Sequence, residues 1–144
     1  MCIRDRLYIL LINSDKMNSL SVSAIDVILE IRGKVKLSCQ LKRHLSPTTI
    51  GLITRSLPLE GNVHRIGSSI VYIVTGIDSG IERKKTNFKN GDIAFLPAEG
   101  SICFFVDDVS ITKPMTPIGR MLGNLNVLRK VKAGDILSLY AATG

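Results

Sequence analysis

Few residues in this 144-residue chain combine types and spacing that could carry chemistry. The dipeptide His64-Arg65 places an imidazole beside a guanidinium, and Asp107-Asp108 places two carboxylates together. Neighbouring side chains of a regular strand point to opposite faces, so we do not expect His64 and Arg65 to work as a pair. Two carboxylates without further ligands make a weak cation site, and a rim loop is the simpler interpretation of Asp107-Asp108. No complete catalytic constellation is present.

The three cysteines give no sign of metal or redox chemistry. Cys2, Cys39 and Cys103 are odd in number and lack C-x-x-C spacing, so they predict neither a zinc site nor a disulfide framework. Cys39 and Cys103 alternate with apolar neighbours and are expected to be small core residues. The sequence predicts no metal site and no cofactor.

Composition and charge narrow the class of protein. Hydrophobic residues make up 45% and charged residues 22%, which is typical of a globular chain and excludes wholesale disorder. The formal net charge of +7 permits a nucleic-acid partner but does not require one. Basic residues fall in scattered groups at turns and on the polar phase of strands, which favours a solvated surface; the groups are 34–36, 42–44, 83–89 and 129–132.

The N-terminal segment is interpreted separately. "MCIRDR" resembles a translated sequencing-adapter peptide, so we expect residues 1–16 to be a non-native or disordered extension and residues 17–144 to be the domain. The apolar stretch Leu7–Ile12 is too short for the core of a signal peptide, and no other stretch reaches the length of a membrane span. We therefore expect a cytoplasmic protein without a membrane partner.

The first half of the domain reads as a hairpin followed by a helix. Apolar residues alternate along 25–31 and 35–42, and Gly33 between them suits a tight turn. Pro47–Ser56 carries an apolar helical stripe, with Ser46 as the expected N-cap and Pro58 as the stop signal. The helix is placed to lie across one end of a barrel.

The second half is rich in short strands. Residues 59–62 and 107–116 are expected to be loops, and the polar insert 78–89 a surface hairpin or flap. A short helical turn is expected at 124–128. The remaining strands are predicted at 63–66, 70–77, 92–96, 101–106, 118–122 and 135–140. Seven or eight mostly antiparallel strands with one or two short capping helices predict a mainly β fold closed into a barrel.

Two segments resemble cyclophilins, and more closely a family of small uncharacterised prokaryotic proteins with a cyclophilin-like barrel. They are "LSPTTIGLITRSLP" and "GDIAFLPAEGSICFFVDD", and "PIGRMLGNLNVL" and "VKAGDILSL" follow in the order that this family shows. The resemblance covers about residues 25–139 and implies a closed cyclophilin-like β-barrel.

Arg65 is the residue through which the resemblance bears on activity. "VHRI" is similar to the cyclophilin strand whose His-Arg dipeptide supplies the guanidinium for prolyl isomerisation, a rotation with a barrier of ~18–20 kcal/mol. Cyclophilins continue with Phe-Met-x-Gln, whereas Ile70–Val74 here contains no glutamine. Arg65 therefore has three interpretations: a surface cation, an anchor for a peptide or anionic ligand, or an isomerase arginine.

The leading functional hypothesis is a cyclophilin-like domain that binds a peptide or small ligand in a groove at the side of the barrel, without strong catalysis. The resemblance suggests Arg65, Tyr72, Phe95 and Phe104 as the lining. The alternative is a peptidyl-prolyl cis-trans isomerase with Arg65 as its catalytic residue. A second alternative, a nucleic-acid-binding protein, rests on positive charge alone and is not favoured. The oligomeric state is left open.

Phe104 and Phe105 pose a packing question of their own. They are neighbours in a predicted strand, so they point to opposite faces and cannot share one core. The second ring could line a ligand groove or belong to a second core layer. The sequence favours two core layers.

Overall fold

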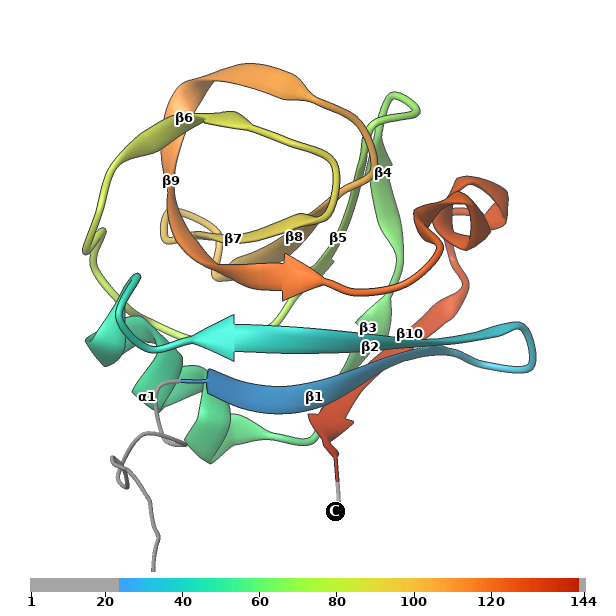
Figure 1. Ribbon diagram of the computed structural model, residues 1–144, viewed down its shortest axis with the longest axis horizontal. Coiled ribbons are helices and arrows are strands. Elements are labelled where there is room, and N and C mark those ends of the chain that lie inside the picture. Colours follow the sequence, from blue (N-terminus) through green and yellow to red (C-terminus); the bar gives the residue numbers. More distant parts are fainter. Residues whose placement is uncertain (1–23, 143–144) are drawn as a thin grey trace, which may run out of the picture.

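The computed structural model describes residues 24–142, which form ten strands, one α-helix and one 3₁₀-helix (Figure 1). The expected N-terminal extension, residues 1–16, lies outside the described residues. The boundary that starts a domain at residue 17 lies outside them too, so both stay predictions. No helix within residues 24–142 has the length and apolar character needed to cross a membrane.

The predicted hairpin and its turn are confirmed. β1 (Ala24–Ile31) pairs antiparallel with β2 (Val35–Lys42), and Ile31 lies opposite Val35. Gly33 in the turn between them adopts φ +74°. Glycine reaches this conformation at little energetic cost because it has no Cβ. Most residues of the apolar phase of both strands are buried, and those of the other phase are exposed or half-buried, which fixes the register of the pair.

The ten described strands form one antiparallel sheet. Nine of them follow the order β3-β10-β1-β2-β9-β7-β8-β5-β4, and β6 pairs with β9 off this path. Their bounds are β3 Leu59–Asn62, β4 His64–Ile66, β5 Ile70–Val74, β6 Lys85–Phe88, β7 Asp92–Leu96, β8 Ser101–Phe105, β9 Val109–Met121 and β10 Ile136–Ala141.

The mainly β fold is thus confirmed, but closure into a barrel is not. Within residues 24–142 the sheet ends in β3 at one edge and β4 at the other, and no ladder joins them. These two strands are consecutive in the chain and only Val63 separates them. Its amide donates to the carbonyl of Asp135 at 2.7 Å, and its carbonyl accepts from Gly134 at 2.9 Å. The edge strands β3 and β4 are therefore joined covalently through Val63 and not by a ladder of hydrogen bonds, as they would be in a closed barrel.

Two expected loops are strands. Residues 59–62 form β3 against β10, and most of 107–116 belongs to the long strand β9. Proline argued against a strand at 107–116, because it has no N–H to donate. β9 accommodates Pro114 where its pairing with β6 shifts, between Met115 and Ser110. Pro117 lies beside a second shift, in the pairing of β9 with β7.

The strands enclose a main core and a second, smaller core. Phe104 lies in the main core with Phe95, whereas Phe105 lies in the smaller cluster with Ala94 and Cys103. The strand β6 covers this cluster, and Phe88 stacks on Phe105 with ring centroids 4.4 Å apart. The prediction of two core layers is confirmed.

The predicted helix forms as α1 (Pro47–Ser56) and buries Ile50 and Ile53. Ser46 occupies the N-cap position as predicted, but its hydroxyl donates to the carbonyl of Pro117 at 2.8 Å and makes no capping hydrogen bond. The side-chain acceptor at this helix end is instead the carboxylate of Glu82, which accepts from the amides of Thr48 at 3.1 Å and Thr49 at 2.9 Å. Slight burial works to raise the pKa of Glu82, but these bonds outweigh it and lower that pKa below its ordinary value.

Candidate functional site

Phe95 and Phe104, two of the four residues suggested to line a groove, are core residues. Each has 0% of its surface exposed, and both belong to the main core. Phe104 lies opposite Ile93 and Val71 in the sheet, which are buried in the same core. Neither ring is available to a ligand in this structure.

Tyr72 lies on the other face of the sheet. It is opposite Cys103, packs against the smaller core, and stacks on the imidazole of His64 with centroids 5.2 Å apart. Arg65 lies opposite Val71, a main-core residue, so His64 and Arg65 do occupy opposite faces as predicted. The four residues do not converge, and their role in binding stays a prediction that this geometry does not support.

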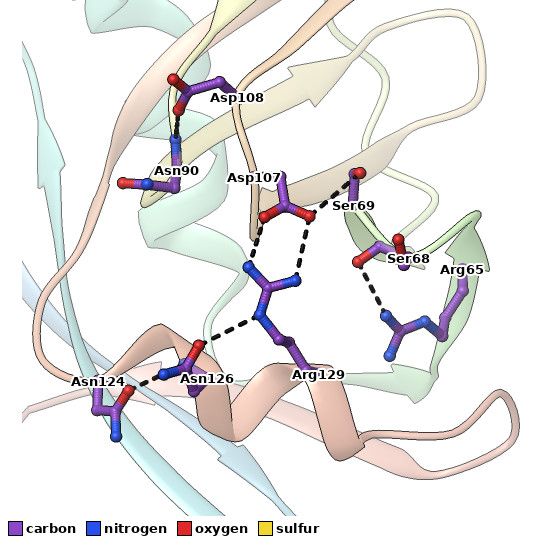
Figure 2. Close-up of polar contacts among 9 residues, drawn as sticks. All are labelled: Arg65, Ser68, Ser69, Asn90, Asp107, Asp108, Asn124, Asn126 and Arg129. Atoms are coloured by element: carbon purple, nitrogen blue, oxygen red, sulfur yellow. Dashed lines mark hydrogen bonds and ion pairs between the residues drawn. The ribbon is translucent and has the colours of Figure 1, made fainter.

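The guanidinium of Arg65 is occupied by backbone carbonyls. It donates to Val131 at 2.5 Å and to Leu128 at 3.2 Å, at the end of the 3₁₀-helix η2 (Leu125–Lys130). It also donates to Ser68 at 3.2 Å in the β4–β5 turn, as Figure 2 shows. Basic side chains can donate to carbonyls at a helix C-terminus, and Arg65 does so here and ties η2 to β4.

A second cluster ties η2 to the β8–β9 turn. Arg129 donates to both carboxylate oxygens of Asp107, at 2.5 and 3.2 Å, and Ser69 donates to the same carboxylate at 3.3 Å (Figure 2). The hydrogen bonds from Arg129 hold the pKa of Asp107 below its ordinary value. The carboxylate of Asp107 is therefore occupied by Arg129 and Ser69, and it holds the β8–β9 turn against η2. Within residues 24–142 no group of three or more His, Cys, Asp or Glu is placed to hold a metal ion.

The candidate site lies instead where β6, β7 and β9 meet. Two surface hollows, of about 670 and 300 Å³, share the lining residues Lys85, Asp92 and Arg120. We call the two hollows together the basic groove. Its charged and titratable lining residues are Lys42, His44, Arg83, Lys85, Lys89, Asp92, Asp108 and Arg120.

Asp92 organises the centre of the basic groove. Its side chain is only 12% exposed, and it accepts from Arg120 at 2.6 Å and from the amide of Lys89 at 2.9 Å. The ammonium of Lys85 lies 3.9 Å from the second oxygen. Arg120 also donates to the carbonyl of Asn90 at 3.1 Å, so its guanidinium is held in place by two partners.

Gly91 makes room for this arrangement. It adopts φ +92°, and a Cβ at this position would lie 2.9 Å from the guanidinium of Arg120. A side chain here would be strained and would press on that arginine. The Asn90-Gly91 turn therefore sets both the backbone entry into β7 and the position of Arg120.

Sequence reasoning missed the basic groove. Lys85 and Arg120 are 35 positions apart in the sequence, and the pairing of β6 and β7 with β9 is what brings them together. The available signal was the group of cations at 83–89 immediately before the Asn90-Gly91 turn and the acidic Asp92. Scattered cations favour a solvated surface, and nothing in the sequence marks Arg120 as their partner.

The comparisons with known proteins agree on the fold. The hypothetical protein AF2241 from Archaeoglobus fulgidus has a solution structure that matches with a TM-score of 0.68 and 20% identity, over 83% of this chain and 96% of that one. McbB, solved in complex with tryptophan, matches with a TM-score of 0.71 and 12% identity over 82% of this chain. This chain spans only 45% of McbB. No curated protein matches significantly.

The family comparison covers most of the chain. The model of the family described as cyclophilin-like matches residues 24–139, from the first residue of β1 to within two residues of the end of β10. The matched range includes both cores and the whole lining of the basic groove. The chain belongs to the cyclophilin-like family.

Proposed function

We propose that this cyclophilin-like protein is a binding protein that holds a peptide or small ligand in the basic groove, without strong catalysis. The observation that carries the proposal is the pair of adjoining hollows with Lys85, Asp92 and Arg120 at their common boundary. A concave surface with a few fixed polar groups is the usual form of a ligand site. We retain the expectation that the protein acts in the cytoplasm.

The walls of the basic groove are preorganised. Arg120 is fixed by Asp92 and Asn90, and Phe88 anchors β6 in the smaller core with 2% of its surface exposed. Groups held in position before binding lose little conformational entropy when a ligand arrives. This supports a site that binds its ligand without rearranging.

Prolyl isomerisation receives less support. The reaction calls for a guanidinium free to hold the prolyl carbonyl, and Arg65 already donates to carbonyls of Leu128, Val131 and Ser68. A proline-peptide assay separates the two functions. Turnover by the wild-type protein well above that of a folded Arg65→Ala variant would replace the binding proposal with the isomerase.

The binding proposal is tested by blocking the groove without changing charge. Ser110 is exposed and lines the larger hollow, so Ser110→Trp should fill it. Ser68→Trp, at an exposed turn outside the groove, is the matched control. A panel of short peptides and small metabolites, neutral and charged, is titrated into ¹⁵N-labelled protein.

The expected result is a set of compounds that shift the amide signals of Lys85, Asp92 and Gly119. Those shifts should disappear in Ser110→Trp and persist in Ser68→Trp. If no compound of the panel shifts these amides, or if Ser110→Trp responds as the wild type does, the basic groove is not the binding site.

A further inference from the structure

We propose that the ligand of the basic groove carries a small oxyanion, a carboxylate or phosphate group, and that Arg83, Lys85 and Arg120 bind it. This inference rests on the proposed binding function and names the chemical class of the ligand. It is drawn from the donors left over in the groove and from the balance of charge around them.

Donors remain after the internal contacts are made. A guanidinium has five N–H donors, and the contacts of Arg120 within the described residues are those to Asp92 and Asn90. The ammonium of Lys85 is 3.9 Å from Asp92, which is beyond hydrogen-bond length. Both side chains are partly exposed, at 43% for Arg120 and 46% for Lys85. An oxyanion between them would receive bonds from both.

The charges in the groove do not cancel. Five cations and two carboxylates contribute to its lining, and the carboxylate of Asp92 is already used by Arg120 and the Lys89 amide. Among residues 24–142, Lys42 and Arg83 have no carboxylate within 4.0 Å. Like charges gathered in a recess repel one another, and a bound anion removes that cost.

The shape and lining favour a small anion over a nucleic-acid strand. Asp92 and Asp108 interrupt the positive lining, so a run of phosphodiesters would meet a carboxylate at each hollow. Base stacking requires exposed aromatic faces. Among the described residues that line the groove only the imidazole of His44 offers one, because Phe88 is 2% exposed. A single carboxylate or phosphate group fits between the carboxylates.

The test uses two probes and a matched pair of variants. Succinate represents carboxylates and inorganic pyrophosphate represents phosphates, each titrated calorimetrically into the full chain at low salt. Lys85→Gln removes one cation from the groove. Lys36→Gln removes one cation from another lysine that also lies 3.9 Å from a carboxylate, that of Glu30, outside the groove.

The expected result is saturable binding of at least one probe, weakened about tenfold in Lys85→Gln and unchanged in Lys36→Gln, because a charge-assisted bond is lost only in the first. The tighter probe identifies carboxylate or phosphate as the preferred group. Circular dichroism and the midpoint of thermal unfolding establish that both variants fold. If Lys85→Gln does not fold, Arg83→Gln replaces it with the same expectation.

Three outcomes overturn the inference. Neither probe binds at millimolar concentration, or Lys85→Gln binds as the wild type does, or a single-stranded oligonucleotide binds with an affinity that grows with its length. If neutral compounds still shift the groove amides while both anions fail, the anion assignment falls and the binding function stands. If nothing shifts those amides, both fall.

Discussion

Arg65 illustrates how one residue type supports two different functions. A guanidinium can hold a substrate carbonyl, and it can equally hold the carbonyls of its own chain. In this protein the carbonyls of Leu128 and Val131 occupy it at the end of η2, where Leu128 also accepts from the Val131 amide at 3.3 Å. We therefore infer that Arg65 stabilises the fold by joining β4 to the end of η2.

That assignment predicts the effect of Arg65→Ala. The variant removes the Arg65 donor from the carbonyl of Val131 and the second donor from that of Leu128, so the free energy of unfolding should fall by about 2 kcal/mol. Arg65→Lys should recover only part of it, since an ammonium cannot reach several carbonyls in fork geometry. Urea denaturation measures both. Equal stability of all three proteins would show that the cap contributes nothing.

The buried thiols give a second prediction at this scale. Burial raises the pKa of Cys39 and of Cys103 to about 12 each, so almost no thiolate is present at neutral pH. In a Cys2→Ser variant, a thiol reagent such as DTNB at pH 7.5 should modify the folded protein at least ~100-fold more slowly than the urea-unfolded one. Rapid modification of the folded protein would contradict this.

The residues also show what a single sequence can and cannot predict. Alternation along β1 and β2 and the pair Phe104-Phe105 predicted faces correctly, because the period of a strand is a local property. The N-cap position Ser46 was predicted, but the side-chain acceptor for the first amides of α1 was missed, because Glu82 is 33 positions from Thr49 in the chain. The basic groove was missed for the same reason: its cations meet only through the pairing of β6 with β9.

At the scale of elements, β6 is a short strand that a single ring secures. Three of its four residues are exposed, and only Phe88 is buried, stacked on Phe105. Lys85, at the other end of β6, lies 5.4 Å over the Phe88 ring. The position of the groove lysine thus depends on the packing of the smaller core.

Phe88→Ala tests that dependence. Removing the ring should lower the free energy of unfolding by about 3 kcal/mol. It should also increase hydrogen exchange of the β6 and β9 amides before it affects β1 and β2, which pack in the main core. Phe88→Leu is the control and should lose less than half as much. Uniform exchange changes across both cores would show that β6 is not a separate unit.

β2 and β9 meet at a glycine for a steric reason. A Cβ on Gly119 would lie 2.1 Å from the carbonyl oxygen of Gln40, so the two backbones could not keep their pairing. Gly119→Ala should therefore lower the free energy of unfolding by roughly 3 kcal/mol. Gly80→Ala, which meets nothing within 4 Å, is the matched control. Similar unfolding midpoints for the two variants would contradict the close approach.

At the scale of the molecule, three carboxylates join parts that are distant in the chain. Glu82 ties the segment before β6 to α1, and Asp107 ties the β8–β9 turn to η2. Asp135 joins the start of β10 to the β1–β2 turn through Lys34 at 3.0 Å. The amide of Lys132 and the ammonium of Lys34 hold the pKa of Asp135 below its ordinary value, as for the other two carboxylates.

The sign of the resulting pH dependence follows from linkage. A carboxylate with a lowered pKa in the folded protein binds fewer protons than it does in the unfolded chain, so its contribution is complete above the ordinary carboxyl pKa. That contribution is lost as pH falls through the lowered folded value. We therefore expect stability to decrease in acid, below about pH 4.

The triple variant Glu82→Gln, Asp107→Asn, Asp135→Asn should be less stable than the wild type at pH 7, and the difference should shrink as the pH falls to 3. Urea unfolding at pH 7, 4 and 3 measures this convergence. Asp78→Asn, at an exposed position outside these contacts, should follow the wild type throughout. Parallel stability curves for wild type and triple variant would mean that these three carboxylates do not cause the loss of stability in acid. The distant parts of the sheet would then be held by the two cores alone.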